Sequence, residues 1–273
     1  MKVHSPQKKK NHLPKNYFAT YPKITYSSKE YQNESYNNYM EDIIYINPEF
    51  NGGHHKSLFC IFDGHGGNKS AKISSEKLPK NFLKNLKEKP SNIEQDLINS
   101  FKVTDNQLKN ENCFHEGNTA TIIYLEYNKL YCANVGDSSC YIISNNKAEK
   151  ISYDDKCIDK NEKNRIEKLG NHIYSERLEG ILSITRALGD FNLKGNGLIC
   201  LPHIKIYNLS HFNKFCVIAS DGVWDVIDEN LLFELSNGIN NCKELCDIIV
   251  NEAINRGSED NISCIVIGFN WKY

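Results

Sequence analysis

The chain has 273 residues, enough for one large domain or two small ones, and 40% of them are hydrophobic, which is sufficient for a buried core. The 33 basic and 34 acidic residues give a net charge of −1, so no global field attracts the chain to nucleic acid or to an anionic membrane. We therefore expect neither of these as a partner.

The ten cysteines show no Cys-x-x-Cys spacing, and several lie inside apolar runs, where a reduced thiol behaves as a small hydrophobic group. This use of cysteine is typical of a reducing, intracellular compartment. The sequence has no signal-peptide core and no apolar stretch of membrane-spanning length. We expect a cytoplasmic protein, and the basic run Lys8-Lys9-Lys10 leaves a nuclear location open as well.

Residues 1–20 contain that basic run and few aliphatic residues, which predicts a flexible basic tail before a single folded domain at residues 21–273. Within the domain, the apolar residues 43–46 and 58–62 predict strands. Residues 68–86 predict a helix, or two helices broken at Pro79. Residues 91–108 predict a further helix, with Ser91 as its cap and Glu94 three residues later.

The middle of the chain predicts an antiparallel hairpin, because residues 119–125 and 130–135 are β-rich and are joined by residues 126–129. Helices are predicted at residues 159–169, 231–235 and 243–254, and strands at 215–219 and 262–269. Hairpins with helices between them favour a layered α+β fold over a doubly wound parallel sheet.

Acidic residues recur where the predicted strands begin or end. Asp63-Gly64, Gly136-Asp137 and Asp221-Gly222 follow three apolar runs, and Glu41-Asp42 and Asp260 precede two others. Carboxylates gathered at strand ends repel unless a cation lies among them, and hard oxygen ligands select Mg²⁺ or Mn²⁺ rather than zinc. The pattern indicates a magnesium or manganese enzyme. The alternative is that Asp-Gly is an ordinary turn dipeptide and that the other acids are surface charge.

His65 stands in the sequence Gly64-His65-Gly66-Gly67, directly after Asp63. A plain turn requires neither the histidine nor three glycines, whereas glycine permits a ligand to approach the backbone closely. Histidine also has the pKa range of a general acid. The alternative, an unpartnered core histidine, is disfavoured by the flanking glycines.

The ordered motifs resemble the metal-dependent protein phosphatases of type 2C over residues 35 to 269, nearly the whole chain. The motifs that carry the resemblance are Met40-Glu41-Asp42, Phe62-Asp63-Gly64-His65-Gly66-Gly67, Gly117-Asn118-Thr119-Ala120, Ala133-Asn134-Val135-Gly136-Asp137-Ser138, Thr185-Arg186-Ala187-Leu188-Gly189-Asp190, Ala219-Ser220-Asp221-Gly222-Val223-Trp224-Asp225 and Glu259-Asp260-Asn261.

The resemblance implies a four-layer α-β-β-α sandwich, in which two antiparallel sheets are flanked by paired helices. It also implies two Mg²⁺ or Mn²⁺ ions per subunit, and hydrolysis of phosphoserine and phosphothreonine in phosphorylated proteins by a metal-bridged hydroxide. Residues 21–273 would then be one catalytic domain, and we expect a monomer that acts in signalling.

The resemblance implies a role for each candidate residue from its position in the motifs. Asp63 is the candidate bridge between the two ions, and Glu41, Asp221, Asp260 and the carbonyl of Gly64 complete the two shells. Asp42 is expected to hold metal-bound waters, because Mg²⁺ keeps several of them. Asp137 matches a third, weaker metal position in the family. His65 is the candidate general acid for the serine leaving group.

The chain departs from the family pattern at several positions. Asn37 stands where the family usually has an arginine that grips the substrate phosphate with a bidentate fork. Ser139 replaces another common arginine, and Asp154-Asp155 stands where an Asp-His pair is usual. The stretch after Asp190, where a substrate-facing flap would lie, is short.

Two hypotheses follow. The first is an active Mg²⁺- or Mn²⁺-dependent serine/threonine phosphatase, because every expected metal position and His65 are present. The second is a catalytically weak or inactive pseudophosphatase that binds phosphoproteins, because the phosphate-gripping arginine is replaced by Asn37.

Overall fold

The structure is a computed structural model that describes residues 21–53, 55–88 and 92–271. The predicted basic tail at residues 1–20 and the predicted helix cap Ser91 lie outside the described residues. Within the described part of the chain, no helix is long and apolar enough to cross a membrane.

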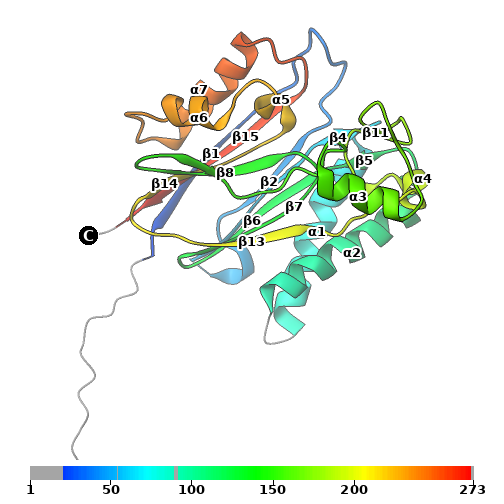
Figure 1. Cartoon of the computed structure of the whole chain (residues 1–273). Coiled ribbons are helices and arrows are strands. Elements are labelled where there is room, and N and C mark those ends of the chain that lie inside the picture. Colours follow the sequence, from blue (N-terminus) through cyan, green and yellow to red (C-terminus); the bar gives the residue numbers. More distant parts are fainter. Residues whose placement is uncertain (1–20, 54, 89–91, 272–273) are drawn as a thin grey trace, which may run out of the picture.

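Two five-stranded antiparallel sheets form the centre of the protein (Figure 1). The first sheet has the order β1 (Lys23–Tyr31), β15 (Ile262–Asn270), β14 (Asn213–Ala219), β8 (Ser139–Ser144) and β9 (Ala148–Lys150). The second sheet has the order β13 (His203–Asn208), β7 (Lys129–Val135), β6 (Ala120–Glu126), β3 (Lys56–Phe62) and β2 (Ile43–Asn47).

A pair of helices covers the outer face of each sheet. Helices α6 (Glu229–Leu235) and α7 (Cys242–Asn255) lie on the first sheet, and α1 (Lys69–Glu88) and α2 (Ile93–Asn110) lie on the second (Figure 1). The helix pairs and the two sheets between them confirm the predicted four-layer α-β-β-α sandwich.

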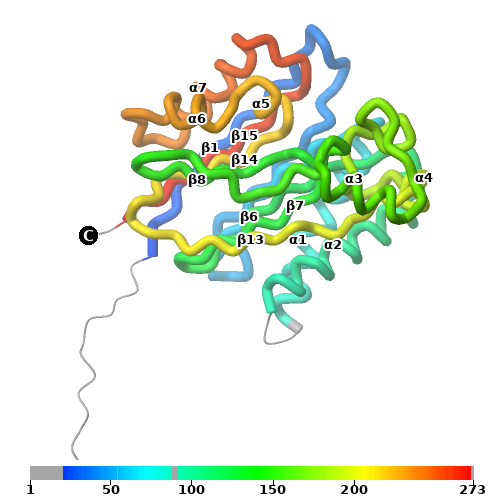
Figure 2. The backbone as a smooth tube through the Cα atoms, in the orientation of Figure 1, coloured from blue at the N-terminus to red at the C-terminus, as the bar shows by residue number. Residues whose placement is uncertain are grey.

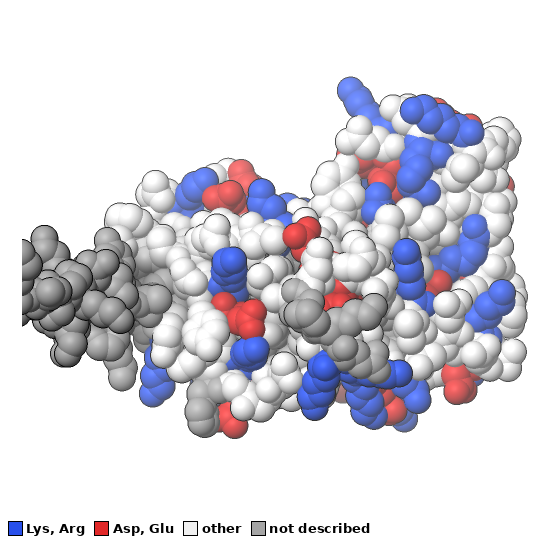
Figure 3. Space-filling view, turned by 90° about the horizontal axis from the view of Figure 1, so that it is seen from below, with Lys and Arg blue, Asp and Glu red and all other residues white. Residues whose placement is uncertain are grey.

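Figure 3 shows the molecule from below, where basic and acidic side chains are interspersed over the surface.

Alternation along the strands explains why they appear as continuous apolar runs. On β3, Leu58, Cys60 and Phe62 pack toward α1 and α2, whereas Phe59 and Ile61 pack between the sheets. Strands β14 and β15 divide their side chains in the same way between the α7 side and the space between the sheets. Because both faces of these strands are buried, a period of two cannot be seen in their hydrophobicity.

Two sequence predictions need correction in detail. Helix α1 runs through Pro79 without a break, so the alternative of two helices is wrong. Its buried residues Ala71, Leu78 and Phe82 lie on both sides of the proline, and their burial against the second sheet opposes a break. The hairpin between β6 and β7 turns over two residues, not four, because Glu126 already pairs with Lys129.

Helix α2 begins one residue later than the predicted cap would place it. Asn92 is its N-cap, and the Asn92 side chain accepts a hydrogen bond from the amide of Gln95. An amide side chain serves this position as well as a serine hydroxyl does.

A small unit projects at one end of the sandwich, beside the end of β7 (Figure 2). It contains α3 (Lys160–Lys168), β10 (Ile173–Tyr174), β11 (Arg177–Leu178) and α4 (Phe191–Lys194), around a small core of its own. Most of this unit precedes Asp190, and the stretch after Asp190, where the sequence predicts a short flap, contains α4. The remaining elements are η1 (Phe50–Gly52), α5 (Asp221–Trp224) and a three-stranded sheet of β12 (Leu188–Gly189), β5 (Gly117–Asn118) and β4 (Gly64–His65).

Phe82 provides a test of the packing between the second sheet and α1. Its ring stacks on Phe50 at a centroid distance of 5.7 Å and meets Tyr124 edge-on at 5.1 Å. We expect Phe82→Ala to lower the free energy of unfolding in urea by about 3–5 kcal/mol, because it leaves a cavity in a closed core. Phe212→Ala is the control, since Phe212 is 55% exposed. Equal losses in the two variants would contradict this packing.

Candidate metal centre and catalytic site

Strand register brings the predicted acidic residues to one end of the sandwich. In the second sheet, Ile43 pairs with Phe62, so Asp42 before β2 lies beside Asp63 after β3. In the first sheet, Ala219 pairs with Cys264, so the turn with Asp221 lies near the loop with Asp260. Because neighbouring antiparallel strands end where their partners begin, both sheets deliver carboxylates to the same edge.

Asp137 lies where the chain crosses from the second sheet to the first, between β7 and β8. Next to it, the hydroxyl of Ser138 is 2.7 Å from that of Thr119 and 3.5 Å from a carboxylate oxygen of Asp63. The amide of Thr119 in turn donates to the carbonyl of Asp63 at 2.8 Å. These hydroxyls fix the ends of three strands around Asp63.

Burial and the nearness of like charges raise the pKa values of these carboxylates. Burial raises the pKa of Asp42 to about 8, with further contributions from the charges of Asp221 and Asp260. Burial also raises the pKa of Asp63 well above its usual value, and the charges of Asp42, Asp137 and Asp260 add to that rise. The pKa of Asp221 is raised well above its usual value by burial and then by the charge of Asp63. The cluster is therefore costly to ionise fully without a cation.

The residues fit a site for hard divalent cations. Among the described residues, no lysine or arginine forms an ion pair with Asp42, Asp63 or Asp221, so no basic side chain balances their negative charge. Asp137 differs, because the ammonium group of Lys156 lies 3.7 Å from its carboxylate and 3.3 Å from that of Asp225. A donor set made only of carboxylate and carbonyl oxygens suits Mg²⁺ and Mn²⁺.

Glu41 and Gly64 approach each other at the backbone. A carboxylate oxygen of Glu41 accepts a hydrogen bond from the amide of Gly67 at 2.6 Å. A Cβ atom at position 64 would lie 2.7 Å from the carbonyl oxygen of Glu41, so only glycine fits there. Burial raises the pKa of Glu41, although the hydrogen bond from Gly67 opposes the rise.

Two polar residues, which the sequence analysis named as parts of motifs but gave no role, hold the acidic loops together. The buried side chain of Asn261 accepts from the amide of Glu41 at 2.7 Å and donates to the carbonyl of Gln32 at 2.7 Å. The buried hydroxyl of Ser220 donates to a carboxylate oxygen of Asp42 at 2.8 Å. No signal in a single sequence separates these residues from ordinary loop residues.

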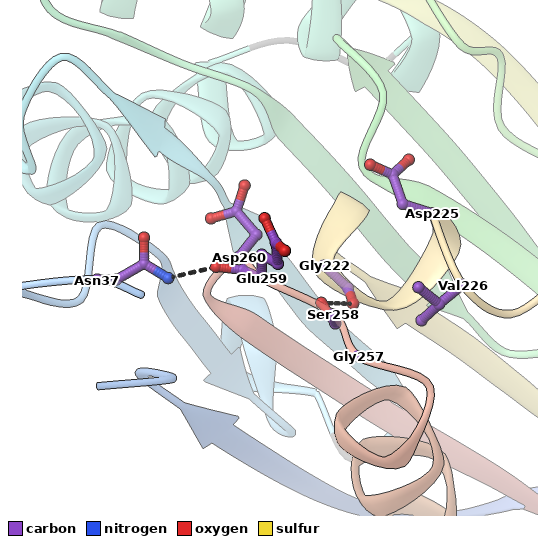
Figure 4. Close-up of a pocket in the computed structure, with 8 residues that line it drawn as sticks. All are labelled: Asn37, Gly222, Asp225, Val226, Gly257, Ser258, Glu259 and Asp260. Carbon is purple, nitrogen blue, oxygen red and sulfur yellow. Dashed lines mark hydrogen bonds between the residues drawn. The ribbon is translucent and has the colours of Figure 1, made fainter. Parts of the chain in front are cut away.

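Asn37 and Asp260 line one pocket of about 340 Å³ (Figure 4). The Asn37 side chain donates to the carbonyl of Glu259 at 2.9 Å, which leaves one amide N–H for another partner. Asp225 lies on the opposite wall, across the pocket from Glu259. The pocket thus joins the predicted substrate-binding position to the acidic end of the sandwich.

His65 lies next to this acidic end, on the small sheet of β12, β5 and β4. His65 pairs with Gly117, and Gly117 pairs with Gly189. The sheet therefore joins the motif around Asp63 to two motifs that are distant in the sequence. Nε2 of His65 lies 2.6 Å from a carboxylate oxygen of Asp190, a contact that the sequence analysis missed.

A second acidic group lies at the base of the projecting unit. Asp155, Glu162 and His203 place ligand atoms within 4.8 Å of one another, closer than any such triple from the predicted metal set. However, the guanidinium group of Arg186 contacts Glu162 at 2.6 Å and Asp155 at 3.2 Å. Hydrogen bonds from Arg186 and Arg165 overcome the effect of burial and lower the pKa of Glu162 to about 2. We therefore interpret this group as an ion-pair network.

Comparison with known proteins agrees with this geometry. A family model described as Protein phosphatase 2C matches residues 26–262. Protein phosphatase 2C homolog 1 of Schizosaccharomyces pombe is 31% identical over 251 residues, which cover 87% of this chain and 71% of the relative. Probable protein phosphatase 2C 21 of Oryza sativa subsp. japonica is 28% identical over 290 residues, which cover 90% of this chain and 84% of the relative.

Solved structures show the same architecture. The structure of a C. elegans sex determining protein has a TM-score of 0.81 and 26% identity, over 90% of this chain and 64% of that chain. The serine-threonine phosphatase 2C from Toxoplasma gondii has a TM-score of 0.75 over 92% of this chain and 96% of that chain. At 19% identity, the second likeness is one of fold alone.

The raised pKa values predict how pH and metal act on stability. The folded pKa of Asp42, about 8, exceeds its ordinary value of 3.8, so the folded protein holds a proton that the unfolded chain releases. That stabilisation is complete below the ordinary value and is lost as pH rises toward 8. In chelator, we therefore expect a lower Tm at about pH 8 than at about pH 6, and a larger increase in Tm on adding Mn²⁺ at the higher pH.

Thermal unfolding with and without Mn²⁺ checks this prediction. Asp42→Asn is the matched control, because it removes the ionisable group and should reduce the difference between the two pH values. A metal-free protein whose Tm rises between about pH 6 and pH 8 would contradict the prediction.

Proposed function

Since the chain belongs to the protein phosphatase 2C family, we propose that it hydrolyses phosphoserine and phosphothreonine in proteins with the help of two Mg²⁺ or Mn²⁺ ions. The observation that carries the proposal is the convergence of carboxylates from both sheets at one edge, where Asp42, Asp63 and Asp221 have no basic partner among the described residues. Such an edge suits divalent cations, and it lies beside a pocket of about 340 Å³ that can take a phosphorylated side chain.

Asp63 would be the central ligand of the ions, because it is buried and the charges of Asp42, Asp137 and Asp260 all act on it. Asp221, Asp260, Glu41 and the carbonyl of Gly64 would complete the ligand set, and Asp42 would hold coordinated waters. When bound, the ions supply the positive charge that lowers the pKa of a coordinated water toward neutrality and neutralises the phosphoryl oxygens.

The protein itself contributes the proton and the phosphate contact. His65 lies next to Gly64 on β4, close to the ligand set, and we assign it as the general acid that protonates the serine or threonine oxygen. Asn37 can offer the phosphate one N–H group and no charge, because its other N–H is directed at Glu259. Most of the positive charge at the substrate phosphate would therefore come from bound cations, not from position 37.

The third metal position is the weakest of the set. Asp137 and Asp225 already contact the ammonium group of Lys156, which supplies the positive charge that an ion would otherwise bring. Burial would lower the pKa of Lys156, but the charges of Asp137 and Asp225 outweigh it and raise that pKa, so the ammonium remains charged. An ion at this position has to displace it.

The cysteines support a reducing compartment, as expected for a cytoplasmic or nuclear enzyme. All ten are free, and nine of them are buried, where they pack as small hydrophobic groups.

An inactive phosphoprotein-binding pseudophosphatase is the second candidate. Its support is Asn37, which leaves the phosphate without the arginine fork that the family usually provides. The complete acidic edge favours the active enzyme, because a protein that only binds phosphate has no need for uncompensated carboxylates.

Hydrolysis of a small aryl phosphate with Mn²⁺ decides between the two candidates. We expect turnover that chelator abolishes and that Asp63→Asn or Asp221→Asn lowers by more than about 100-fold, since outer partners of a metal site already contribute 10- to 100-fold. Asp247→Asn is the control, because this half-exposed residue lies on α7, where its carboxylate pairs with Lys29. A protein that binds phosphopeptide but shows no metal-dependent turnover would be the pseudophosphatase.

Asn37→Arg tests how substrate phosphate is held. We expect KM for a phosphoserine peptide to fall by about tenfold with little change in kcat, because a charged bond to phosphate contributes about 1.5–3 kcal/mol. Asn146→Arg, on the exposed turn between β8 and β9 at the opposite end of the first sheet, adds the same charge and should leave KM unchanged. An unchanged KM in both variants would show that position 37 does not face the phosphate.

A further inference from the structure

The contact between His65 and Asp190 indicates a role in the reaction for Asp190, which the sequence motifs alone do not indicate. Nε2 of His65 and a carboxylate oxygen of Asp190 are 2.6 Å apart, within the range of a strong hydrogen bond. Asp190 is buried, with 6% of its side chain exposed, whereas His65 keeps 28% exposed. One ring nitrogen is therefore held inside the protein, and the ring still reaches the surface of the site.

Apart from its contact with His65, the side chain of Asp190 has no role in the described structure. It stands at the N-terminus of the four-residue helix α4, but its side chain makes no capping hydrogen bond there. No described lysine or arginine pairs with it. Its carboxylate is directed at His65 alone.

The backbone holds Asp190 in a conformation that is unusual for a residue other than glycine, with φ of 50°. Its amide donates to the carbonyl of Glu116 at 3.0 Å, and its carbonyl accepts from the amide of Leu193 at 2.9 Å. On the preceding residue, the amide of Gly189 donates to Asp105 at 2.9 Å. Such strain persists where the surroundings fix it, and it often occurs at functional sites.

Gly117 leaves the space in which the two side chains meet. It is the central position of the small sheet, between His65 on β4 and Gly189 on β12. A Cβ atom on Gly117 would lie 1.8 Å from the carboxylate oxygen of Asp190 and 2.6 Å from Nε2 of His65. Glycine in this motif thus permits the contact itself.

We propose that Asp190 is a positioning residue that orients the ring of His65 for proton transfer; this inference rests on the proposed phosphatase activity. The carboxylate holds the proton on Nε2, which leaves Nδ1 to face the leaving group. The ring that acts as the acid is doubly protonated and carries a second proton on Nδ1. As a water oxygen bonds to phosphorus and the P–O bond to serine breaks, the electron pair of that bond goes to the serine oxygen, which takes the Nδ1 proton. The ring then remains neutral with its proton on Nε2, and solvent restores the proton on Nδ1.

Leaving-group dependence separates this role from a structural one. A serine hydroxyl is a poor leaving group that needs a proton, whereas a nitrophenolate leaves readily without one. We expect Asp190→Asn to lower kcat on a phosphoserine peptide by about 10- to 100-fold and kcat on p-nitrophenyl phosphate by less than about threefold. Asparagine is suitable because it tolerates the positive φ, so the backbone is not altered. Asp247→Asn is the matched control and should change neither value.

Coupling to His65 gives the second arm of the experiment. In a His65→Ala background, Asp190→Asn should cause no further loss on the phosphoserine peptide, because the residue that it positions is gone. Additive losses would overturn the proposal, and so would equal losses on the two substrates. Wild-type protein that hydrolyses neither substrate with Mn²⁺ would overturn the phosphatase activity as well, which distinguishes the two failures.

The ring tautomer is measured on the wild-type protein, so this readout does not depend on the folding of Asp190→Asn. ¹⁵N chemical shifts of the imidazole, assigned with His65→Gln, should show the neutral ring of wild-type His65 protonated at Nε2. A neutral ring protonated mainly at Nδ1 would overturn the proposal.

Discussion

Buried carboxylates that face one another across the end of the sandwich repel, and the four layers hold them together against that repulsion. Burial and mutual charge raise the pKa values of Asp42, Asp63 and Asp221. Such a cluster persists because its members are fixed by strand register, and the registers are fixed by strands that are buried on both faces. In the proposed function, relief of this repulsion would contribute to affinity for a divalent cation.

The sequence predicted the sandwich and the acidic edge because both leave local signals. A run such as residues 58–62 is apolar throughout, and the carboxylate that follows it is easily seen. The role of Asp190 left no such signal, because it depends on pairing between residues 64–65, 117–118 and 188–189, which are far apart in the chain. The core of the projecting unit left no signal in the sequence either, since its members come together only in three dimensions.

One departure from the family pattern is compensated within the fold. Asp155, where the family usually has a histidine, accepts from the amide of Gly136 at 2.9 Å, next to Asp137. It also contacts His203 at 2.9 Å and Arg186 at 3.2 Å, so the acid is balanced by a histidine and an arginine. Burial still raises the pKa of Asp155 to about 6 against these partners. Asn37 has no comparable compensation, because the described residues that line its pocket include no basic side chain.

Two parts of the protein contribute different groups to the candidate site. The strand ends of the sandwich supply the ligand set around Asp63. The projecting unit and the segments at its base supply groups that act on that set, namely Lys156 beside Asp137 and Asp190 beside His65. Changes in the projecting unit can therefore alter occupancy of the third position, or proton transfer by His65, while every metal ligand remains in place. In the proposed mechanism, activity depends on that unit as well as on the carboxylates.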